Sequence, residues 1–314
     1  NSMSDLLNNP EKKLPKLIGT TNREVRENIG RCFNEMYPET GGIDKFIQDK
    51  IKDQNMQPLI EALFDERSTT EAKKLAEAIG IFSVDEEPVY EMLFNYPKWL
   101  KDEIKKKYKK LTGKSLRKDL EDSFIEPIRS NVDRFLSADR ETDPTIRREQ
   151  SENLCKLLSE NHPKTWMENK DIMEAFADLS PEELILAGRL YAKEKDGEGL
   201  MDAIRILPES QKKFLENCLG YFICPPLKYV ERIKKILDTK KCTDYEIQKK
   251  LMDIIQSRSD VDLALINKFY MMKNGTSMKD DFSEIIPDYA KSPVYNLLNV
   301  IISKGIYDDV YKKK

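Results

Sequence analysis

The stretch Ile254–Phe282, IIQSRSDVDLALINKFYMMKNGTSMKDDF, decides the fold of this 314-residue chain. Its apolar residues from Leu263 to Tyr270 have the three- and four-residue spacing of an amphipathic helix, which predicts a helix over about 260–273. Gly275 follows that helix, and glycine readily adopts the left-handed conformation that ends a helix. The stretch therefore predicts a helix, a tight turn and the start of a second helix.

The same order of an aromatic residue, a polar run, a glycine and an apolar residue occurs at three further places. The glycines expected to end helices are Gly41, Gly113, Gly197 and Gly275. Successive aromatic residues are 75, 83 and 79 residues apart, at Phe33, Tyr108, Tyr191 and Tyr270. Four matches in register are typical of an internal repeat. We predict four repeats, the first with a truncated first helix and the last with a C-terminal tail, over residues 1–68, 69–142, 143–225 and 226–314.

Strand signals are scarce, and the apolar spacing predicts about five short helices in each later repeat. In the second repeat we expect helices over about 70–80, 85–95, 98–111, 115–122 and 124–137. In the fourth repeat we expect them over about 226–237, 244–256, 260–273, 277–286 and 291–303. The predicted fold class is therefore all-α.

Composition excludes several classes of function. Lys and Arg number 53 against 56 Asp and Glu, a net charge of −3, which argues against a nucleic-acid binder of the basic type. The single histidine, His162, excludes a multi-histidine metal site, and nothing near it has the spacing of a catalytic group. We therefore do not expect an enzyme.

The five cysteines indicate a reducing, cytoplasmic setting. Their number is odd and no two form a CxxC pair, which argues against a disulfide framework and a zinc ribbon. No apolar run approaches the roughly 18 residues of a transmembrane helix. The protein is thus expected in the cytoplasm.

Four repeats of this length and helix content resemble the annexin family. Ser257–Asp260 and the pair Asp262-Leu263 stand where the family has its SRSE-x-DL stretch, and Glu103–Asp122 is similar to the second annexin repeat. The resemblance covers roughly residues 10–305. The alpha-giardins, annexin relatives attached to the cytoskeleton of a flagellated protist, are the expected subgroup. The resemblance implies a curved disc that binds acidic phospholipid through calcium, at the inner face of the plasma membrane or on the cytoskeleton.

In annexins a G-x-G-T loop supplies backbone carbonyls to calcium, and an acidic side chain about 38 residues later completes the site. Calcium takes 6–8 oxygen ligands, so too few protein ligands leave positions for water or a lipid phosphate. No G-x-G-T occurs in this sequence, so the resemblance implies only weak or variant sites. The favoured site is in the fourth repeat, Asp288 with the carbonyls of Lys240 and Cys242. The other candidates are Glu209 with the carbonyls of Lys164 and Trp166 in the third repeat, and Asp53 in the first.

Large apolar residues fall on two of these loops. Trp166 lies on the loop of the third repeat, and Ile81 and Phe82 lie on that of the second. Indole suits the bilayer interface, so these side chains are candidates for shallow insertion into the membrane. The alternative is that they fold back and pack against helix ends.

A lysine-rich stretch is the second candidate site. Residues 98–118 hold ten basic residues against two acidic ones. We expect an anionic partner here, namely lipid headgroups, sulfated glycans or the acidic tails of tubulin, with contacts from Lys105, Lys106, Lys107, Lys109 and Lys110. The alternative is a solvated helix face without a partner.

Two functions remain open from the sequence. The first is an annexin-like peripheral membrane protein, calcium-dependent through weak or variant sites, that links membrane and cytoskeleton. The second is a calcium-independent, microtubule-associated scaffold that keeps the annexin fold. The sequence does not give the oligomeric state.

Overall fold

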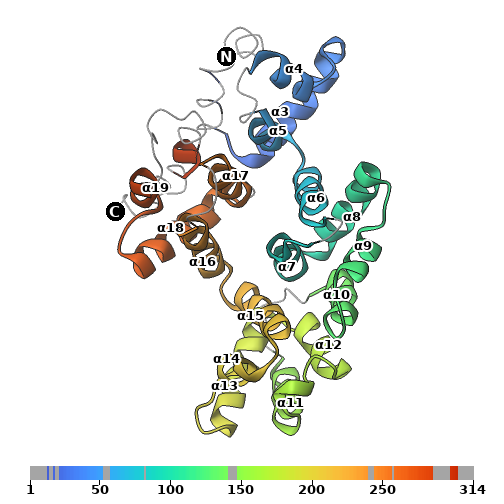
Figure 1. Ribbon diagram of the computed structural model, residues 1–314, viewed down its shortest axis with the longest axis vertical. Coiled ribbons are helices and arrows are strands. Elements are labelled where there is room, and N and C mark those ends of the chain that lie inside the picture. Colours follow the sequence, from blue (N-terminus) through green and yellow to red (C-terminus); the bar gives the residue numbers. More distant parts are fainter. Residues whose placement is uncertain are drawn as a thin grey trace. The chain divides into compact units, whose positions relative to one another are not determined.

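The computed structural model describes the chain as helices joined by short turns (Figure 1). The described residues are 13, 17, 21–51, 57–80, 83–140, 147–239, 244–256, 258–285 and 298–302, with the side chains at 244, 260 and 285 excepted. Within these ranges the only strand-like feature is an isolated bridge between Ile79 and Val84. The prediction of an all-α fold is confirmed. None of the described helices has the length and apolar character needed to cross a membrane.

The chain divides into two compact units. Unit 1 comprises Asn1–Thr70 and Pro226–Lys314, and unit 2 comprises Glu71–Pro225. Unit 1 thus combines both ends of the sequence, whereas unit 2 is continuous. This division does not separate four repeats, so the four-repeat organisation stays a prediction.

Unit 1 contains the first and the last helices of the chain, and α6 continues into unit 2. Their bounds are α3 (Arg23–Met36), η1 (Pro38–Thr40), α4 (Ile43–Lys50), α5 (Gln57–Phe64), α6 (Arg67–Ala78), α16 (Pro225–Leu237), α17 (Asp244–Ile255), α18 (Asp260–Asn274) and α19 (Met278–Ile285). The helices predicted over about 226–237, 244–256, 260–273 and 277–286 are therefore present.

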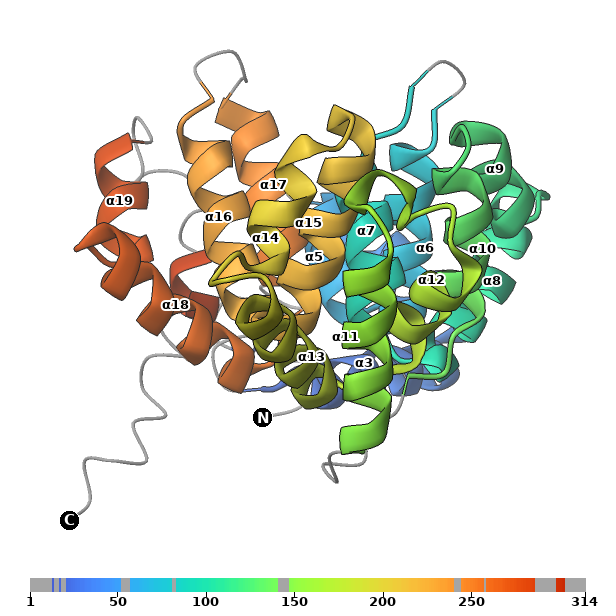
Figure 2. The same ribbon diagram turned by 90° about the horizontal axis from the view of Figure 1, so that it is seen from below.

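Unit 2 contains the central helices, of which α11 and α13 lie side by side in both ribbon views (Figures 1 and 2). Their bounds are α7 (Glu86–Asn95), α8 (Lys98–Thr112), α9 (Leu116–Ser123), α10 (Ile128–Ser137), α11 (Arg148–Glu160), η2 (Pro163–Thr165), α12 (Lys170–Asp178), α13 (Pro181–Glu194), α14 (Leu200–Ala203), η3 (Ile204–Ile206) and α15 (Glu209–Ile223). The helices predicted over about 70–80 to 124–137 agree with α6–α10, except that α10 begins four residues later than predicted.

Two of the four predicted glycines end long helices, Gly113 at α8 and Gly275 at α18, whereas Gly41 caps the 3-10 helix η1 and Gly197 lies two residues beyond the last cap residue of α13. Gly41, Gly113, Gly197 and Gly275 all have φ between 73° and 98°. At α8 the Gly113 N–H donates to the Lys109 carbonyl at 2.9 Å, and at α18 the Gly275 N–H donates to the Met271 carbonyl at the same distance. Only glycine adopts this backbone conformation at little cost, so the glycine positions fix where the two long helices stop.

The repeated aromatic residues anchor these helix ends from inside. Phe33, Tyr108, Tyr191 and Tyr270 are 0–3% exposed. The Tyr108 hydroxyl donates to Asp119 Oδ2 at 2.8 Å, and the Tyr270 hydroxyl donates to Asp281 Oδ2 at 2.6 Å. In both cases the aspartate lies eleven residues after the tyrosine, on the next helix. The same internal bond thus closes the turn after α8 and after α18.

A buried cation distinguishes α3 and α8 from the corresponding helices α13 and α18. Seven residues before the aromatic residue, α3 has Arg26 and α8 has Lys101, whereas α13 and α18 have leucine there. Lys101 Nζ donates to the carbonyls of Phe135 and Ala138 at 2.7 and 3.1 Å, at the end of α10. Burial, with the charges of Arg140 and Lys105, lowers the pKa of Lys101 to about 8.

Helix α13 begins at a buried capping box. The Ser180 hydroxyl accepts from the Glu183 N–H, and the Glu183 carboxylate accepts from the Ser180 N–H. Arg147 donates to the same carboxylate through Nε at 2.7 Å and through its second guanidinium nitrogen at 2.9 Å. These hydrogen bonds lower the pKa of Glu183 to about 2, so the buried carboxylate stays charged.

Candidate functional site

The structure describes one of the predicted calcium loops, that of the third repeat between α11 and α12. Several predicted site residues lie outside the described residues, namely Asp53, Ile81, Phe82, Lys240, Cys242 and Asp288. Their proposed roles therefore stay predictions. Lys164, Trp166, Glu209 and the lysines of α8 can be placed.

The loop of the third repeat is a closed 3-10 turn. The His162 carbonyl accepts from the N–H of Thr165 at 2.8 Å and from its hydroxyl at 2.9 Å. The Pro163 carbonyl accepts from the Trp166 N–H at 3.1 Å, and the Trp166 carbonyl accepts from the Asn169 N–H at 3.2 Å. Most carbonyls of this loop thus already bind donors within the loop, and a cation would have to compete with them or use a second lone pair.

The prediction that the Trp166 side chain contacts the membrane is wrong for this structure. Its side chain is 0% exposed and meets the Tyr191 ring edge-on, with ring centroids 5.7 Å apart. The indole N–H donates to the Asn161 carbonyl at 3.0 Å. Where the loop would need glycine to open, this chain has a large apolar side chain that is more stable in the core than in water.

Glu209 lies beside this loop in the fold. It is the first residue of α15 and follows η3, and η3 packs against η2. Its side chain is exposed and forms an ion pair with Lys212 at 3.4 Å. The third repeat therefore brings its loop and its acidic candidate to neighbouring segments, and the calcium roles predicted for Glu209 and for the carbonyls of Lys164 and Trp166 stay predictions.

A polar pocket of about 480 Å³ adjoins the same loop. It lies between α10 and the start of α12 and is lined by Glu126, Arg134, Glu168 and Lys170 among others. The buried Asn131 amide donates to the Met167 carbonyl at 2.9 Å, which ties the loop to α10. Two acidic and two basic side chains line this pocket, so it has no net preference for a cation. Among the described residues there is no cluster of three His, Cys, Asp or Glu side chains able to hold a metal.

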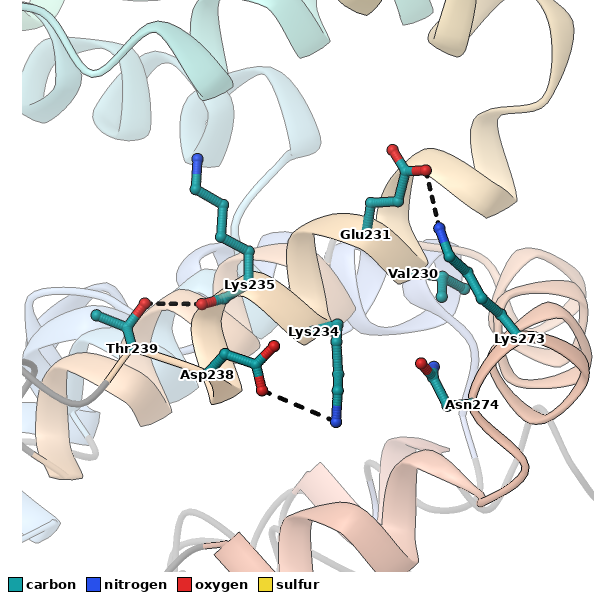
Figure 3. A pocket seen from close by; sticks show the side chains of 8 residues that line it. All are labelled: Val230, Glu231, Lys234, Lys235, Asp238, Thr239, Lys273 and Asn274. Carbon is teal, nitrogen blue, oxygen red and sulfur yellow. Dashed lines mark hydrogen bonds and ion pairs between the residues drawn. The ribbon is translucent and has the colours of Figure 1, made fainter.

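A second pocket, of about 520 Å³, lies between α16 and α18 in unit 1 (Figure 3). Lys273 Nζ approaches Glu231 Oε1 at 2.9 Å, and Lys234 Nζ approaches Asp238 Oδ1 at 3.9 Å. Lys273 and Lys234 thus pair with the two carboxylates of this pocket, and Lys235 is the third lysine of its lining.

The basic stretch forms the exposed face of α8. Leu100, Ile104 and Tyr108 point into the core, at 0–2% exposed, whereas Lys106, Lys109 and Lys110 are exposed. Lys105 pairs with Asp102 at 2.6 Å and Lys106 pairs with Glu103 at 2.7 Å. The two acidic residues of the stretch thus neutralise lysines in the first half of the helix.

Four exposed lysines follow beyond these pairs. They are Lys109, Lys110, Lys114 and Lys118, at the end of α8, on its C-terminal turn and on α9. Within the described part of the chain no ion pair holds any of the four. Of the five predicted contact residues, Lys109 and Lys110 are therefore the best placed for an external anion, whereas Lys105 and Lys106 already have carboxylate partners.

An exposed tryptophan on this helix was not among the predicted site residues. Trp99, in the first turn of α8, is 65% exposed. A signal was available, because the buried positions Leu100, Ile104 and Tyr108 place residue 99 on the opposite side of a helix.

Comparison with known proteins identifies the fold. No protein-family model and no curated sequence matches the chain. Solved structures do match. A structure of annexin III superposes with a TM-score of 0.81 at 18% identity, covering 93% of this chain and 88% of that chain. Chicken annexin V in complex with Zn²⁺ gives 0.75 at 16% identity, covering 93% and 89%.

The calcium-bound structure of alpha-14 giardin gives a TM-score of 0.71 at 14% identity, covering 95% of this chain and 96% of that chain. At these identities the likeness concerns the fold, which annexins and alpha-giardins share. The resemblance seen in Ile254–Phe282 is therefore confirmed at the level of the fold. The chain has the annexin fold.

Proposed function

We propose that this protein is a peripheral membrane protein that binds acidic phospholipid, with calcium held in weak or variant loop sites, and links the membrane to the cytoskeleton. The observation that carries the proposal is the annexin fold over 95% of the chain, shared with the calcium-bound structure of alpha-14 giardin. The neighbouring positions of η2 and η3 in unit 2 support it, because they bring Glu209 close to the loop of the third repeat.

The composition of the loop explains why such sites would be weak. Two carbonyls and one carboxylate provide three or four oxygens, whereas calcium takes 6–8. Water and a lipid phosphate would supply the remainder, so the metal would bind well only between protein and membrane. In the third repeat, binding would also have to displace some hydrogen bonds of the 3-10 turn.

The other predicted calcium residues belong to the same proposal. The favoured site combines Asp288 with the carbonyls of Lys240 and Cys242, and Asp53 is the candidate of the first repeat. Ile81 and Phe82 remain the proposed membrane contacts. The proposed location is the cytoplasm, at the inner face of the plasma membrane or on the cytoskeleton, and the proposed role is binding rather than catalysis.

Sedimentation with phosphatidylserine vesicles tests this function. We expect the protein to pellet with vesicles in calcium and to stay in the supernatant in chelator. Asp288→Ala should remove most of the calcium-dependent pelleting, and Glu209→Gln should remove a smaller part. Glu149→Gln is the matched control, because it changes the same charge on an exposed residue at the opposite end of α11 from the loop. Pelleting that does not depend on calcium, or equal pelleting of all variants, would contradict the calcium sites.

The second candidate function is a calcium-independent, microtubule-associated scaffold. The four exposed lysines without ion pairs favour it, because acidic tails of a filament protein would meet uncompensated positive charge there. Co-sedimentation with microtubules in chelator, together with no vesicle pelleting in calcium, would select this function over the first.

A further inference from the structure

We propose that the exposed face of α8 is a docking surface for an acidic polypeptide segment, with Trp99 as its apolar anchor. The surface is called the Trp99 surface and consists of Trp99, Lys106, Lys109, Lys110 and Lys114. The inference deepens the second candidate function and rests on it for a biological role, while the calcium-dependent lipid proposal does not depend on it.

The exposure of Trp99 is the first observation. The chain has two tryptophans, and Trp166 is 0% exposed whereas Trp99 is 65% exposed. A tryptophan side chain offers a large apolar area, and at interfaces tryptophan is among the residues that contribute most to binding. Trp99 contributes little to the core, so its area is available to a partner.

The order of residues along the helix is the second observation. Trp99, Lys106 and Lys110 share one side of α8, because separations of seven and four residues correspond to about two turns and one turn. Lys109 flanks this row, and Lys114 follows the glycine that ends the helix. The row from Trp99 to Lys110 measures about 16 Å at 1.5 Å per residue.

That length fits a short extended segment. About five residues of extended chain span 16 Å at roughly 3.3 Å per residue. A segment with one apolar side chain on Trp99 and carboxylates two to five residues further on would meet Lys106, Lys109 and Lys110. Lys106 has an exposed partner in Glu103, and an exposed pair of this kind is exchanged for another at little cost.

The acidic residues of α8 favour a polypeptide over a membrane. Asp102 and Glu103 lie one turn after Trp99 and are 40% and 44% exposed. A flat anionic bilayer resting on Trp99 would cover both carboxylates and face like charges. A narrow polypeptide can follow the lysine row and leave these carboxylates in water.

Fluorescence provides a direct test with the full chain. The probe is a synthetic peptide with one leucine followed by eight glutamates, and the control probe replaces the glutamates with glutamines. We expect the glutamate peptide to change the tryptophan emission of the wild type. Anisotropy of the labelled peptide should show binding at least tenfold weaker in Lys109→Glu/Lys110→Glu/Lys114→Glu and at least threefold weaker in Trp99→Ala. A peptide without leucine should bind the wild type and Trp99→Ala equally.

A matched variant separates local from overall charge. Lys235→Glu/Lys268→Glu/Lys279→Glu makes the same change in net charge on exposed lysines of unit 1 and should bind the peptide within twofold of the wild type. Equal weakening by both triple variants would overturn the surface. Melting curves of all variants establish that each is folded.

Other partners give distinct outcomes. The same proteins are tested for binding to phosphatidylserine vesicles in chelator and to heparin. The polypeptide partner would be overturned if the α8 triple variant lost either of these interactions and the peptide did not bind the wild type. Microtubule co-sedimentation is measured alongside. If the α8 triple variant still bound microtubules, the docking surface would be overturned and the second candidate function would stand. If the wild type bound the peptide but not microtubules, only the second candidate function would be overturned.

Discussion

Helix α8 of unit 2 and helix α18 of unit 1 are built alike and make an informative pair. Each has 15 residues and ends at a glycine with positive φ. Each carries a buried tyrosine whose hydroxyl donates to an aspartate eleven residues later. The buried tyrosine and the glycine at the helix end thus fix the length of both helices, and both helices have them.

The outward faces of the two helices differ in composition. Helix α8 exposes Trp99 and lysines, whereas α18 exposes Val261, Leu265 and Met272 at 69%, 41% and 73%. The fold places no demand on these positions, so they are free to specify partners. The inward sides of these helices thus carry the residues that the fold needs, and the outward side of α8 carries the residues that we propose for partner binding.

One inward position breaks the symmetry. Lys101 in α8 corresponds to Leu263 in α18, and both are buried. Lys101→Leu should lower the free energy of unfolding by about 3 kcal/mol at pH 7, because the Phe135 and Ala138 carbonyls lose their donor. Urea unfolding monitored by circular dichroism measures this change. A loss below about 1 kcal/mol would mean that the leucine of α18 serves equally well in α8.

The effect of Lys101→Leu on the free energy of unfolding should also depend on pH. The pKa of Lys101 is about 8 in the fold, below its usual 10.5. Between these values the unfolded state binds more protons, so the contribution of Lys101 to stability rises with pH, by up to about 1.4 kcal/mol per pH unit. The difference between wild type and Lys101→Leu should therefore grow from pH 7.5 to pH 9.5. A constant difference would show that the lysine keeps an ordinary pKa.

The two tyrosine–aspartate bonds should differ in strength. Asp281 is 6% exposed and also accepts from Thr276 at 2.6 Å, and hydrogen bonds from Thr276, Tyr270 and Lys234 outweigh burial and lower its pKa. Tyr270→Phe should cost about 1.5 kcal/mol, because a charged acceptor loses a buried donor. Tyr108→Phe should cost about 0.5 kcal/mol, because water reaches the half-buried Asp119. Thermal unfolding of both variants compares them, and equal costs would contradict the difference in burial.

The glycines that end the two helices should behave alike. A Cβ added at Gly113 or at Gly275 would meet no atom within 4 Å, so the cost of alanine arises from the left-handed backbone alone. We expect Gly113→Ala and Gly275→Ala each to lower stability by about 1 kcal/mol. A difference of more than about 0.5 kcal/mol in denaturant titrations would show that the surrounding turns are not equivalent.

The outward residues should matter least for stability. Two single variants exchange one outward residue between the helices, Lys110→Met in α8 and Met272→Lys in α18. Each should change the free energy of unfolding by less than about 0.5 kcal/mol. Peptide binding should weaken in Lys110→Met only. A large loss of stability in either variant would contradict the separation of fold and function.

The sequence predicted the fold well because the repeat depends on glycines, aromatic residues and apolar spacing, which are local signals. It missed the aspartates that follow the tyrosines by eleven residues, since a hydrogen bond between two helices has no periodicity. It predicted the wrong environment for the Trp166 side chain, because packing decides whether a loop side chain faces the membrane or the core. It did not predict the ion pairs of Lys105 with Asp102 and of Lys106 with Glu103, because these depend on how side chains on one helix are oriented.

The composition of unit 1 from both ends of the chain has a consequence for biosynthesis. Unit 2, Glu71–Pro225, is continuous and can assemble as soon as it has left the ribosome. The segment Asn1–Thr70 has to wait until unit 2 and then its partner segment Pro226–Lys314 have been made, which takes roughly 12–50 s at about 5–20 residues per second. During that interval the apolar faces of α3 and α5 lack the second half of their unit. A nascent-chain chaperone would find its substrate there.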